Sequence, residues 1–338
     1  MQTLAASIFV FGLLILAHEL GHFFAARATG VKVLELAIGF GPRIVGWEKN
    51  DTSYSLRVFP LGGYCRMLGE DPDDELSKDS FIQKTVAQRS LVLLAGAVMN
   101  LVLALVLFFI IFFFLVGSPL TGNSRLGSVS PASPAGEAGL KPGDEIIKID
   151  GKEINNWDDV VANIENRAGE ELEIVVNRNQ ENLTLTAVPV KNPQTGKAII
   201  GITPVVKKYY LAGSIQTSLS RFALIILSIG QVISGKAPLD VAGPVGIIMI
   251  VGEVAATGFV NLLWLAALIS ISLGIINLLP VPALDGGRLL FLIIEGIRGK
   301  PLDPEKEGFI HFIGFALLLL LILFVTYHDL IRWDLIPK

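Results

Sequence analysis

The apolar stretch LAASIFVFGLLILAHELGHFFAA, residues 4–26, decides the expected fold because it carries three ionisable side chains within five positions. These side chains belong to His18, Glu19 and His22. Hydrocarbon makes an ionisable side chain costly, so such residues inside an apolar segment are candidates for a functional site. On a helix, residues four apart project from one face, which places the two histidines together. The pattern H-E-x-x-H is typical of zinc sites, with the glutamate as general base for a water molecule.

A simpler interpretation of this motif is a helix end at which the two histidines form hydrogen bonds with their neighbours. The whole chain contains 4 histidines. With so few histidines, the H-E-x-x-H pattern would arise by chance in about one chain in a hundred of this composition. We expect zinc ligation by His18 and His22.

Composition indicates a membrane protein. The 338 residues are 52% hydrophobic and 17% charged, which is more apolar than a soluble protein. The net charge of −4, without a basic run, argues against a nucleic-acid partner. Cys65 is the only cysteine, which excludes an intrachain disulfide and a cysteine zinc site. A cleavable signal peptide would discard the H-E-x-x-H motif, so we expect a retained transmembrane helix.

Three further spans have few or no ionisable residues and are close to the ~20 residues that cross a bilayer. They are residues 91–116, 259–284 and 309–327. Residues 27–89 carry nine Lys and Arg, and residues 288–306 carry four, so the positive-inside rule places both segments in the cytoplasm. We expect four transmembrane helices, with both termini and most of the segment between the second and third helices outside.

This topology predicts a third zinc ligand. The span 259–284 descends towards the cytoplasm and is followed by Asp285, at the depth expected for His22. Two histidines and one carboxylate leave the fourth tetrahedral position open for water. Pro280 and Pro282 cannot continue a regular helix, and irregular backbone is tolerated at membrane depth where it lines protein or water. An interfacial turn around Asp285 is the alternative.

Other segments show the patterns of strands and of an interfacial helix. Residues 33–67 alternate and are punctuated by glycine, which predicts strands. Residues 122–206 predict an inserted domain with strands at 126–129, 145–149, 172–178, 183–190 and 198–205, a helix at 157–166, and a tight hairpin at Asp150-Gly151. Residues 211–234 contain one charge, Arg221, and predict an amphipathic interfacial helix or a partial membrane entry.

Together these motifs resemble the site-2 protease family of intramembrane zinc metalloproteases. The first motif, His18-Glu19-x-x-His22, is accompanied by Asn277-x-x-Pro280-x-x-x-Leu284-Asp285-Gly286. The bacterial RseP/RasP branch is further matched by GFGP at 39–42, PLGGY at 60–64, GPVG at 243–246 and the run 277–291. The resemblance implies a zinc metalloendopeptidase with ligands His18, His22 and Asp285 and with Glu19 as catalytic base. It implies that Asn277 holds the substrate backbone or the developing oxyanion.

The resemblance also implies the protein's surroundings. Proteobacterial members of the family carry two PDZ domains. This chain has room for one, and its sequence GLKPGDEII at 139–147 resembles that of bacterial PDZ domains. Such a domain would either bind peptide ends or act as a size filter. The β region is expected to dip into the membrane as a hairpin and to hold the substrate by strand pairing. Substrates would be single-pass transmembrane proteins trimmed first by an upstream site-1 protease, such as anti-sigma factors or remnant signal peptides.

The expected fold is a polytopic α-helical protein of the bacterial cell membrane, with the active site towards the cytoplasm and an extracytoplasmic α+β PDZ domain. We expect the first transmembrane helix and zinc motif at 1–30, a cytoplasmic or membrane-associated β region and loop at 31–90, the second helix at 91–117, the PDZ domain at 121–206, an amphipathic segment at 207–258, the third helix with the third ligand at 259–287, a cytoplasmic loop at 288–308, the fourth helix at 309–330 and an outer tail at 331–338.

Two other functional classes place ionisable groups in membranes. A metal transporter would show paired repeats with broken helices in both halves, which we do not find in the sequence. A non-catalytic scaffold would use the PDZ domain for binding and would not need Glu19. The glutamate therefore separates a protease from both alternatives.

Overall fold

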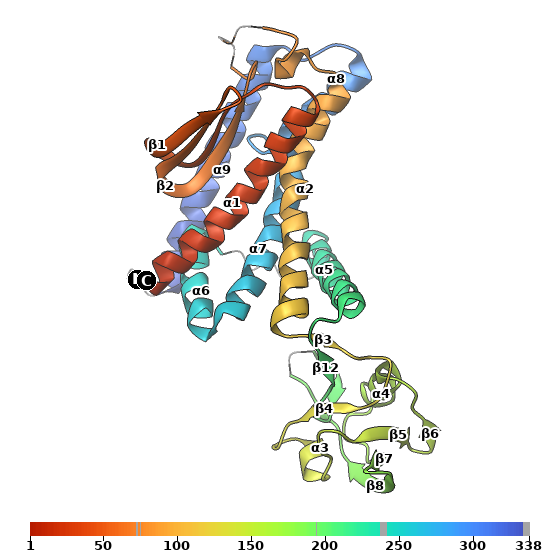
Figure 1. Ribbon diagram of the computed structural model, residues 1–338. Coiled ribbons are helices and arrows are strands. Elements are labelled where there is room, and N and C mark those ends of the chain that lie inside the picture. Colours follow the sequence, from red (N-terminus) through yellow and green to blue (C-terminus); the bar gives the residue numbers. More distant parts are fainter. Residues whose placement is uncertain (72–73, 75, 194, 237–241, 334–338) are drawn as a thin grey trace. The chain divides into compact units, whose positions relative to one another are not determined.

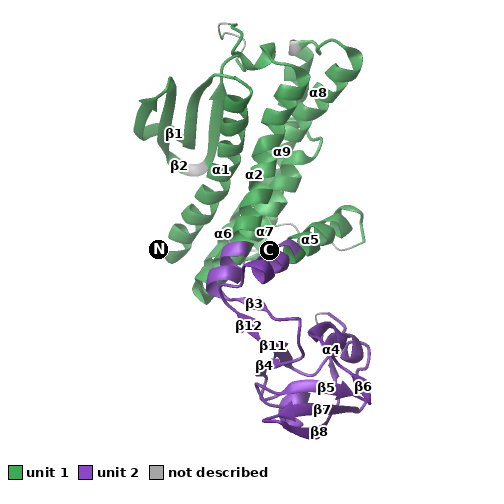
Figure 2. Ribbon diagram, turned by 45° about the vertical axis from the view of Figure 1, so that its right-hand side comes forward, with its two compact units in different colours: residues 1–108, 220–338 green, residues 109–219 purple. Residues whose placement is uncertain are grey.

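The computed structural model describes residues 1–71, 74, 76–193, 195–236 and 242–333 (Figure 1). Most of the expected outer tail, residues 334–338, lies outside this part of the chain. The chain divides into two compact units, one formed by residues 1–108 and 220–338 and the other by residues 109–219 (Figure 2).

Long aliphatic runs form the long helices, which belong to the first unit except for the end of α2, its π-helical turn and the start of α5. Proline at the first position of α6 and α9 and Gly299, in the left-handed conformation after α8, fix helix ends as expected. The helices are α1 (Gln2–Ala28), α2 (Val86–Ile110), α5 (Leu211–Ile233), α6 (Pro244–Thr257), α7 (Phe259–Leu278), α8 (Asp285–Arg298) and α9 (Pro304–Arg332), with a π-helical turn (Ile111–Leu115) after α2.

Five of the described helices are long and apolar enough to cross a membrane: α1, α2 with its π-turn, α5, α7 and α9. The sequence predicted four, and α5 is the addition. This helix has 23 residues and a single charge, Arg221, so its length and hydropathy are sufficient for a crossing. The chain is therefore a multi-pass membrane protein by length and composition.

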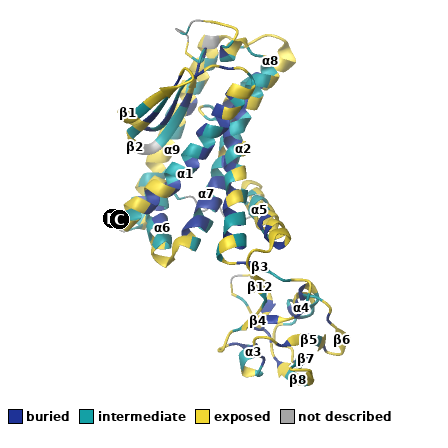
Figure 3. Cartoon of the chain, in the orientation of Figure 1, coloured by how far each residue is buried: buried dark blue, intermediate teal, exposed yellow. Residues whose placement is uncertain are grey.

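Much of the helical surface is exposed (Figure 3). The exposed residues include many large apolar ones. α9 is the clearest case, since only 6% of its most apolar window is buried. A contiguous exposed apolar surface of this kind is unfavourable in water and indicates contact with lipid or another apolar partner. Exposed residues along α9 include Phe309, Phe312, Phe315, Leu317, Leu320, Leu323 and Phe324.

The predicted strand region forms an antiparallel sheet from β1 (Val33–Lys49) and β2 (Thr52–Met67). Register shifts fold these two long strands so that residues 33–38 pair with 53–56 on one side and with 63–67 on the other. Residues 63–67 therefore form an edge of the sheet. The inner end packs against α1 and α2 through a cluster of buried side chains: Phe23, Ala26, Val31, Val33, Leu36, Cys65, Met67 and Val92.

The predicted third span is not one continuous helix through residue 287. α7 ends at Leu278, and six residues separate it from α8, which begins at Asp285. Pro280 and Pro282 explain the break because neither can donate a backbone hydrogen bond within a helix. The segment 288–308, expected as a loop, is helical as far as Arg298.

The second unit contains the inserted domain, residues 118–207. Its main sheet has the order β6-β5-β7-β8, and helix α4 contributes Trp157 and Val160 to the core beneath it. The elements are β3 (Ser118–Pro119), β4 (Leu126–Val129), α3 (Pro134–Glu137), β5 (Glu145–Ile149), β6 (Lys152–Glu153), α4 (Trp157–Ile164), β7 (Leu172–Arg178), β8 (Glu181–Ala187), β9 (Val190–Lys191), β10 (Ala198–Ile199), β11 (Ile202–Pro204) and β12 (Val206–Lys207).

Two turns in this domain follow from backbone chemistry. Asp150 and Gly151 have φ of 45° and 75°, the left-handed pair that joins β5 and β6 in the tight hairpin predicted from the sequence. The expected strand at 198–205 is divided in two at Gly201, which has φ of 84°. A side chain is strained there, and a Cβ would lie 2.3 Å from the Cβ of Ser133.

A buried ion pair explains the KPGD sequence at 141–144. The Arg178 guanidinium donates to both oxygens of the Asp144 carboxylate at 2.7 Å, and the Lys141 amide donates to one of them at 2.8 Å. Burial raises the pKa of the Asp144 carboxyl, but these hydrogen bonds outweigh it and hold the pKa below its usual range. The pair therefore stabilises the domain above about pH 4, and this contribution is lost as the pH falls towards the lower folded pKa.

Replacing Arg178→Met is expected to lower the free energy of unfolding of the inserted domain by about 2–3 kcal/mol, since it leaves the Asp144 carboxylate buried and uncompensated. Hydrogen exchange of the β5 and β7 amides in the full chain measures this at pH 7. The difference from wild type is expected to shrink at pH 3. The control Arg167→Met breaks the more exposed pair with Asp150 and should cost clearly less, because solvent screens that pair. Equal losses in the two variants would contradict the assignment.

Candidate metal centre

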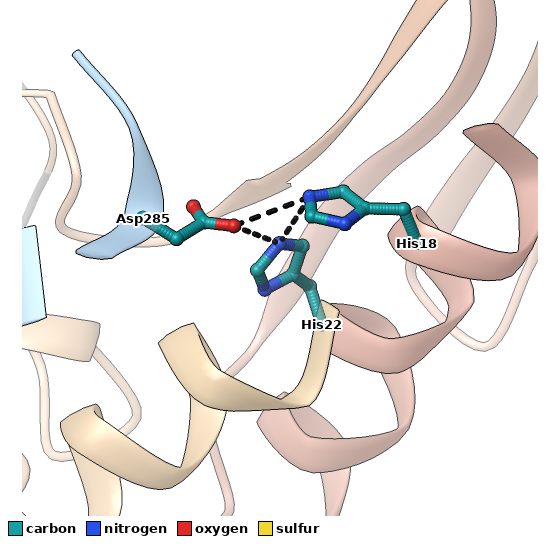
Figure 4. Close-up of side chains that lie close together, drawn as sticks. All are labelled: His18, His22 and Asp285. Atoms are coloured by element: carbon teal, nitrogen blue, oxygen red, sulfur yellow. Dashed lines mark hydrogen bonds and ion pairs between the residues drawn. The ribbon is translucent and has the colours of Figure 1, made fainter. Parts of the chain in front are cut away.

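The two histidines of α1 and the first residue of α8 bring three donor atoms together (Figure 4). The His18 and His22 Nε2 atoms are 3.1 Å apart. The Oδ2 atom of Asp285 lies 3.2 Å from His18 Nε2 and 3.4 Å from His22 Nε2. The three residues expected as zinc ligands, more than 260 positions apart in the chain, thus lie together in one triangle.

This triangle fits a zinc ion. Tetrahedral zinc with ligands at 2.0–2.1 Å requires its donor atoms to be about 3.3 Å apart, which the three separations match. Asp285 Oδ2 is buried and has no hydrogen-bond partner among the described residues, which suits a ligand atom of a cation. His22 Nδ1 lies 2.9 Å from the Val92 carbonyl oxygen, so it carries the proton and donates it, leaving Nε2 free to bind metal.

Close contact between α1 and α2 positions the histidines. A Cβ at Gly21 would lie 2.2 Å from the Ala95 carbonyl oxygen, and one at Gly96 would lie 2.3 Å from His22 Nε2. Small residues allow helices to approach in membranes, and here they leave the space that the two imidazoles occupy. Sequence reasoning missed Gly96, because its role depends on a contact between helices.

The segment between α7 and α8 places Asp285. Ala283 has φ of 78°, a left-handed conformation that is strained for alanine. Its amide donates to Nδ1 of His311, from α9, at 3.1 Å. A Cβ at Gly286 would lie 2.2 Å from the Leu279 carbonyl oxygen, so the first turn of α8 rests directly on the preceding backbone. His311 thus supports the segment that leads to Asp285.

A cavity of about 390 Å³ opens beside the three donors. The buried Glu19 carboxylate lines it and accepts a hydrogen bond from the Cys65 amide. The sheet edge at 63–67 forms another wall, and Gly63 lies so close that a Cβ there would be 3.2 Å from Glu19 Cγ. Asn277 is half-buried near the end of α7 and is not among the described residues that line this cavity.

Comparison with known proteins identifies the family. The sequence profile of peptidase family M50 matches residues 6–321. This chain belongs to peptidase family M50. Its relatives in the family include zinc metalloprotease RasP of Geobacillus kaustophilus, which is 36% identical and covered over 99% of each chain. A putative zinc metalloprotease of Clostridium acetobutylicum is 38% identical over 96% of each chain. The regulator of sigma-W protease RasP of Bacillus subtilis is 34% identical over 98% of this chain and 99% of its own.

The family assignment makes the chain a zinc metalloprotease of the site-2 type. Among solved structures, the PDZ domain of the SdrC-like protein Lmo2051 from Listeria monocytogenes is 25% identical, covering 25% of this chain and 88% of its own, with a TM-score of 0.23. This score is too low to establish the fold, so a single PDZ domain stays a prediction.

In this M50 chain, Gly96→Ala is expected to weaken zinc binding at least about tenfold, because the added methyl group occupies the position of the His22 imidazole. Zinc per chain after gel filtration, measured by mass spectrometry, tests this. Gly12→Ala is the matched control on α1, where a Cβ meets nothing within 4 Å. Full zinc occupancy in the Gly96 variant would show that this helix contact does not position the ligands.

Proposed function

We propose that this zinc metalloprotease hydrolyses peptide bonds in or near transmembrane segments, with His18, His22 and Asp285 as its zinc ligands. The observation that carries the proposal is the meeting of these donors with Glu19 and an open sheet edge in one cavity. Zinc, when bound there, polarises the scissile carbonyl and activates water as a nucleophile.

Glu19 acts as general base and then as general acid. Its carboxylate follows His18 on the same turn of α1 and lines the cavity. It takes a proton from the attacking water and gives it to the leaving amine when the C–N bond breaks. The hydrogen bond from the Cys65 amide holds the carboxylate in place between these two transfers. Asn277 then holds the substrate backbone or the oxyanion once substrate is bound.

The sheet edge at 63–67 holds the substrate. A peptide bond within a transmembrane helix is shielded by its neighbours, so the segment must unwind before hydrolysis. An extended segment can then pair with an edge strand through main-chain hydrogen bonds. The edge at 63–67 lines the cavity directly beside Glu19, which brings a paired strand to the reacting groups. The apolar outer part of the sheet, including Phe40, Trp47 and Phe59, is exposed and suits entry into the membrane.

The expected topology places the zinc end of α1 and α7 towards the cytoplasm and the inserted domain outside. Four crossings, by α1, α2, α7 and α9, satisfy this arrangement. If α5 also crossed inward, the chain would have to return outward before α7. The only described helix between them is α6, which has 14 residues and spans about 21 Å, short of a ~30 Å hydrocarbon core. We therefore assign α5 to the membrane interface.

Substrates of this protease are single-pass membrane proteins already trimmed outside by a site-1 protease. The Bacillus subtilis relative is named for regulating sigma-W, which supports anti-sigma factors as one substrate class; remnant signal peptides are another. The inserted domain, as a PDZ domain on the outer side, binds the trimmed ends or excludes bulky, intact proteins. The lipid bilayer is the second partner, and no nucleic acid is involved.

Glu19→Gln is expected to slow cleavage of a tagged single-pass substrate in detergent by about 10²–10⁴-fold, because the amide cannot accept the proton from water. Zinc per chain should equal that of wild type, since Glu19 is not a ligand. The experiment measures initial cleavage rates and metal content on the same samples.

Glu70→Gln is the matched control, because Glu70 lines the same cavity but pairs with Arg288 at 3.1 Å. This variant should retain most activity. Cleavage by the Glu19 variant at the wild-type rate would refute the assignment of the base. Loss of zinc from the Glu19 variant alone would instead assign Glu19 to metal binding.

A further inference from the structure

Asn100 is a polar side chain at the centre of an apolar helix. It is 1% exposed and is the only residue between Leu91 and Val116 with a polar side chain. Burying an amide is costly unless its atoms form hydrogen bonds. The Nδ2 atom of Asn100 lies 3.4 Å from His18 Nδ1, while its Oδ1 atom is buried and has no hydrogen-bond partner within the part of the chain that the structure describes. The amide thus contacts a zinc ligand and leaves its acceptor atom unused.

The protonation of His18 decides which amide atom can face it. A neutral imidazole carries one proton, and His18 directs Nε2 towards His22 and Asp285. If Nε2 binds zinc, the proton is on Nδ1, which becomes a donor. The His18 Nδ1–H group cannot form a hydrogen bond with the N–H group of the Asn100 amide, because both are donors. Oδ1 of the same amide could accept a hydrogen bond from it.

Rotation of the amide by half a turn resolves both conflicts. The two ends of an Asn side chain are assigned from their hydrogen bonds, since their shapes are nearly equal. With Oδ1 towards His18, the imidazole Nδ1–H has an acceptor and the buried oxygen has a partner. We infer that Asn100 is a positioning residue, which fixes the tautomer and the ring plane of His18 by accepting its Nδ1 proton.

Helix α2 is suited to this role because it already holds the other histidine. The Val92 carbonyl, two turns before Asn100, accepts from His22 Nδ1 at 2.9 Å. The Asn100 backbone is itself anchored, since Ser270 of α7 donates to its carbonyl at 2.7 Å. One helix therefore faces the outer nitrogen of both histidines. Such outer hydrogen bonds typically change metal affinity by about 10–100-fold.

The inference rests on the proposed ligand set and is tested by zinc affinity, measured by competition with a chelator on the full chain in detergent. Asn100→Leu and Asn100→Ala lack an acceptor and are expected to weaken zinc binding by about 10–100-fold. Asn100→Asp keeps an acceptor in either orientation and should bind zinc within a few-fold of wild type. Ser270→Ala removes the anchor but not the acceptor and is the matched control for loosened packing.

Several outcomes would overturn the inference. Wild-type affinity in the Leu or Ala variant would show that His18 needs no acceptor. An Asp variant as weak as the Leu variant would show that the amide acts by shape, as would an equal loss in Ser270→Ala. The variant His18→Ala separates this failure from failure of the ligand set. If it keeps wild-type zinc affinity, the proposed site is wrong, whatever Asn100 does.

Discussion

Three donor atoms from distant parts of the chain meet at separations that suit a single zinc ion, and the surrounding structure holds them there. Two of them come from one face of α1, where helical spacing alone places them together. The third, on Asp285, reaches the triangle only because α7 stops short and α8 starts against its backbone. Tetrahedral coordination sets the separation of the donor atoms, so contacts elsewhere in the chain have to hold each of these placements.

Two kinds of contact hold the ligands in place. In one, glycine allows two backbones to approach closely; in the other, a side chain forms a hydrogen bond with a strained segment. Gly21 and Gly96 allow the backbones of α1 and α2 to approach, and the strained Ala283 is held by His311. Helix α9 is anchored at its other end too, where the buried Asp329 accepts from the Gly243 and Gly246 amides at the start of α6. This contact explains the GPVG sequence at 243–246, since a Cβ at Gly243 would lie 2.6 Å from the Asp329 carboxylate. A carboxylate is favourable at a helix N-terminus, where amides lack partners.

The sequence predicted those features that depend on local chemistry. Helical spacing identified His18 and His22, and Asp150-Gly151 identified a hairpin turn. Features that depend on contacts between distant segments were missed or only partly predicted. The sequence showed that Pro280 would interrupt a helix but not that Asp285 would open a new one, and nothing local indicated that residues 63–67 become a sheet edge beside Glu19.

The sequence already marks Asn100 as unusual, although its role follows only from the structure. A single amide in an otherwise apolar span is a sequence signal of the same kind as the three ionisable groups of α1, yet its partner becomes evident only when α2 lies against His18. Asn277 is the opposite case. It was assigned through a family motif, and its half-buried place near the end of α7 leaves its role a prediction.

In the proposed site, two imidazole nitrogens and one carboxylate oxygen bind zinc and leave one position for water. X-ray absorption at the zinc edge of the purified protein tests this ligand set. We expect a first shell of four nitrogen and oxygen atoms at about 2.0–2.1 Å, with the outer-ring scattering of two imidazoles. A sulfur atom at about 2.3 Å would place Cys65, which lines the same cavity, in the coordination sphere and refute this ligand set.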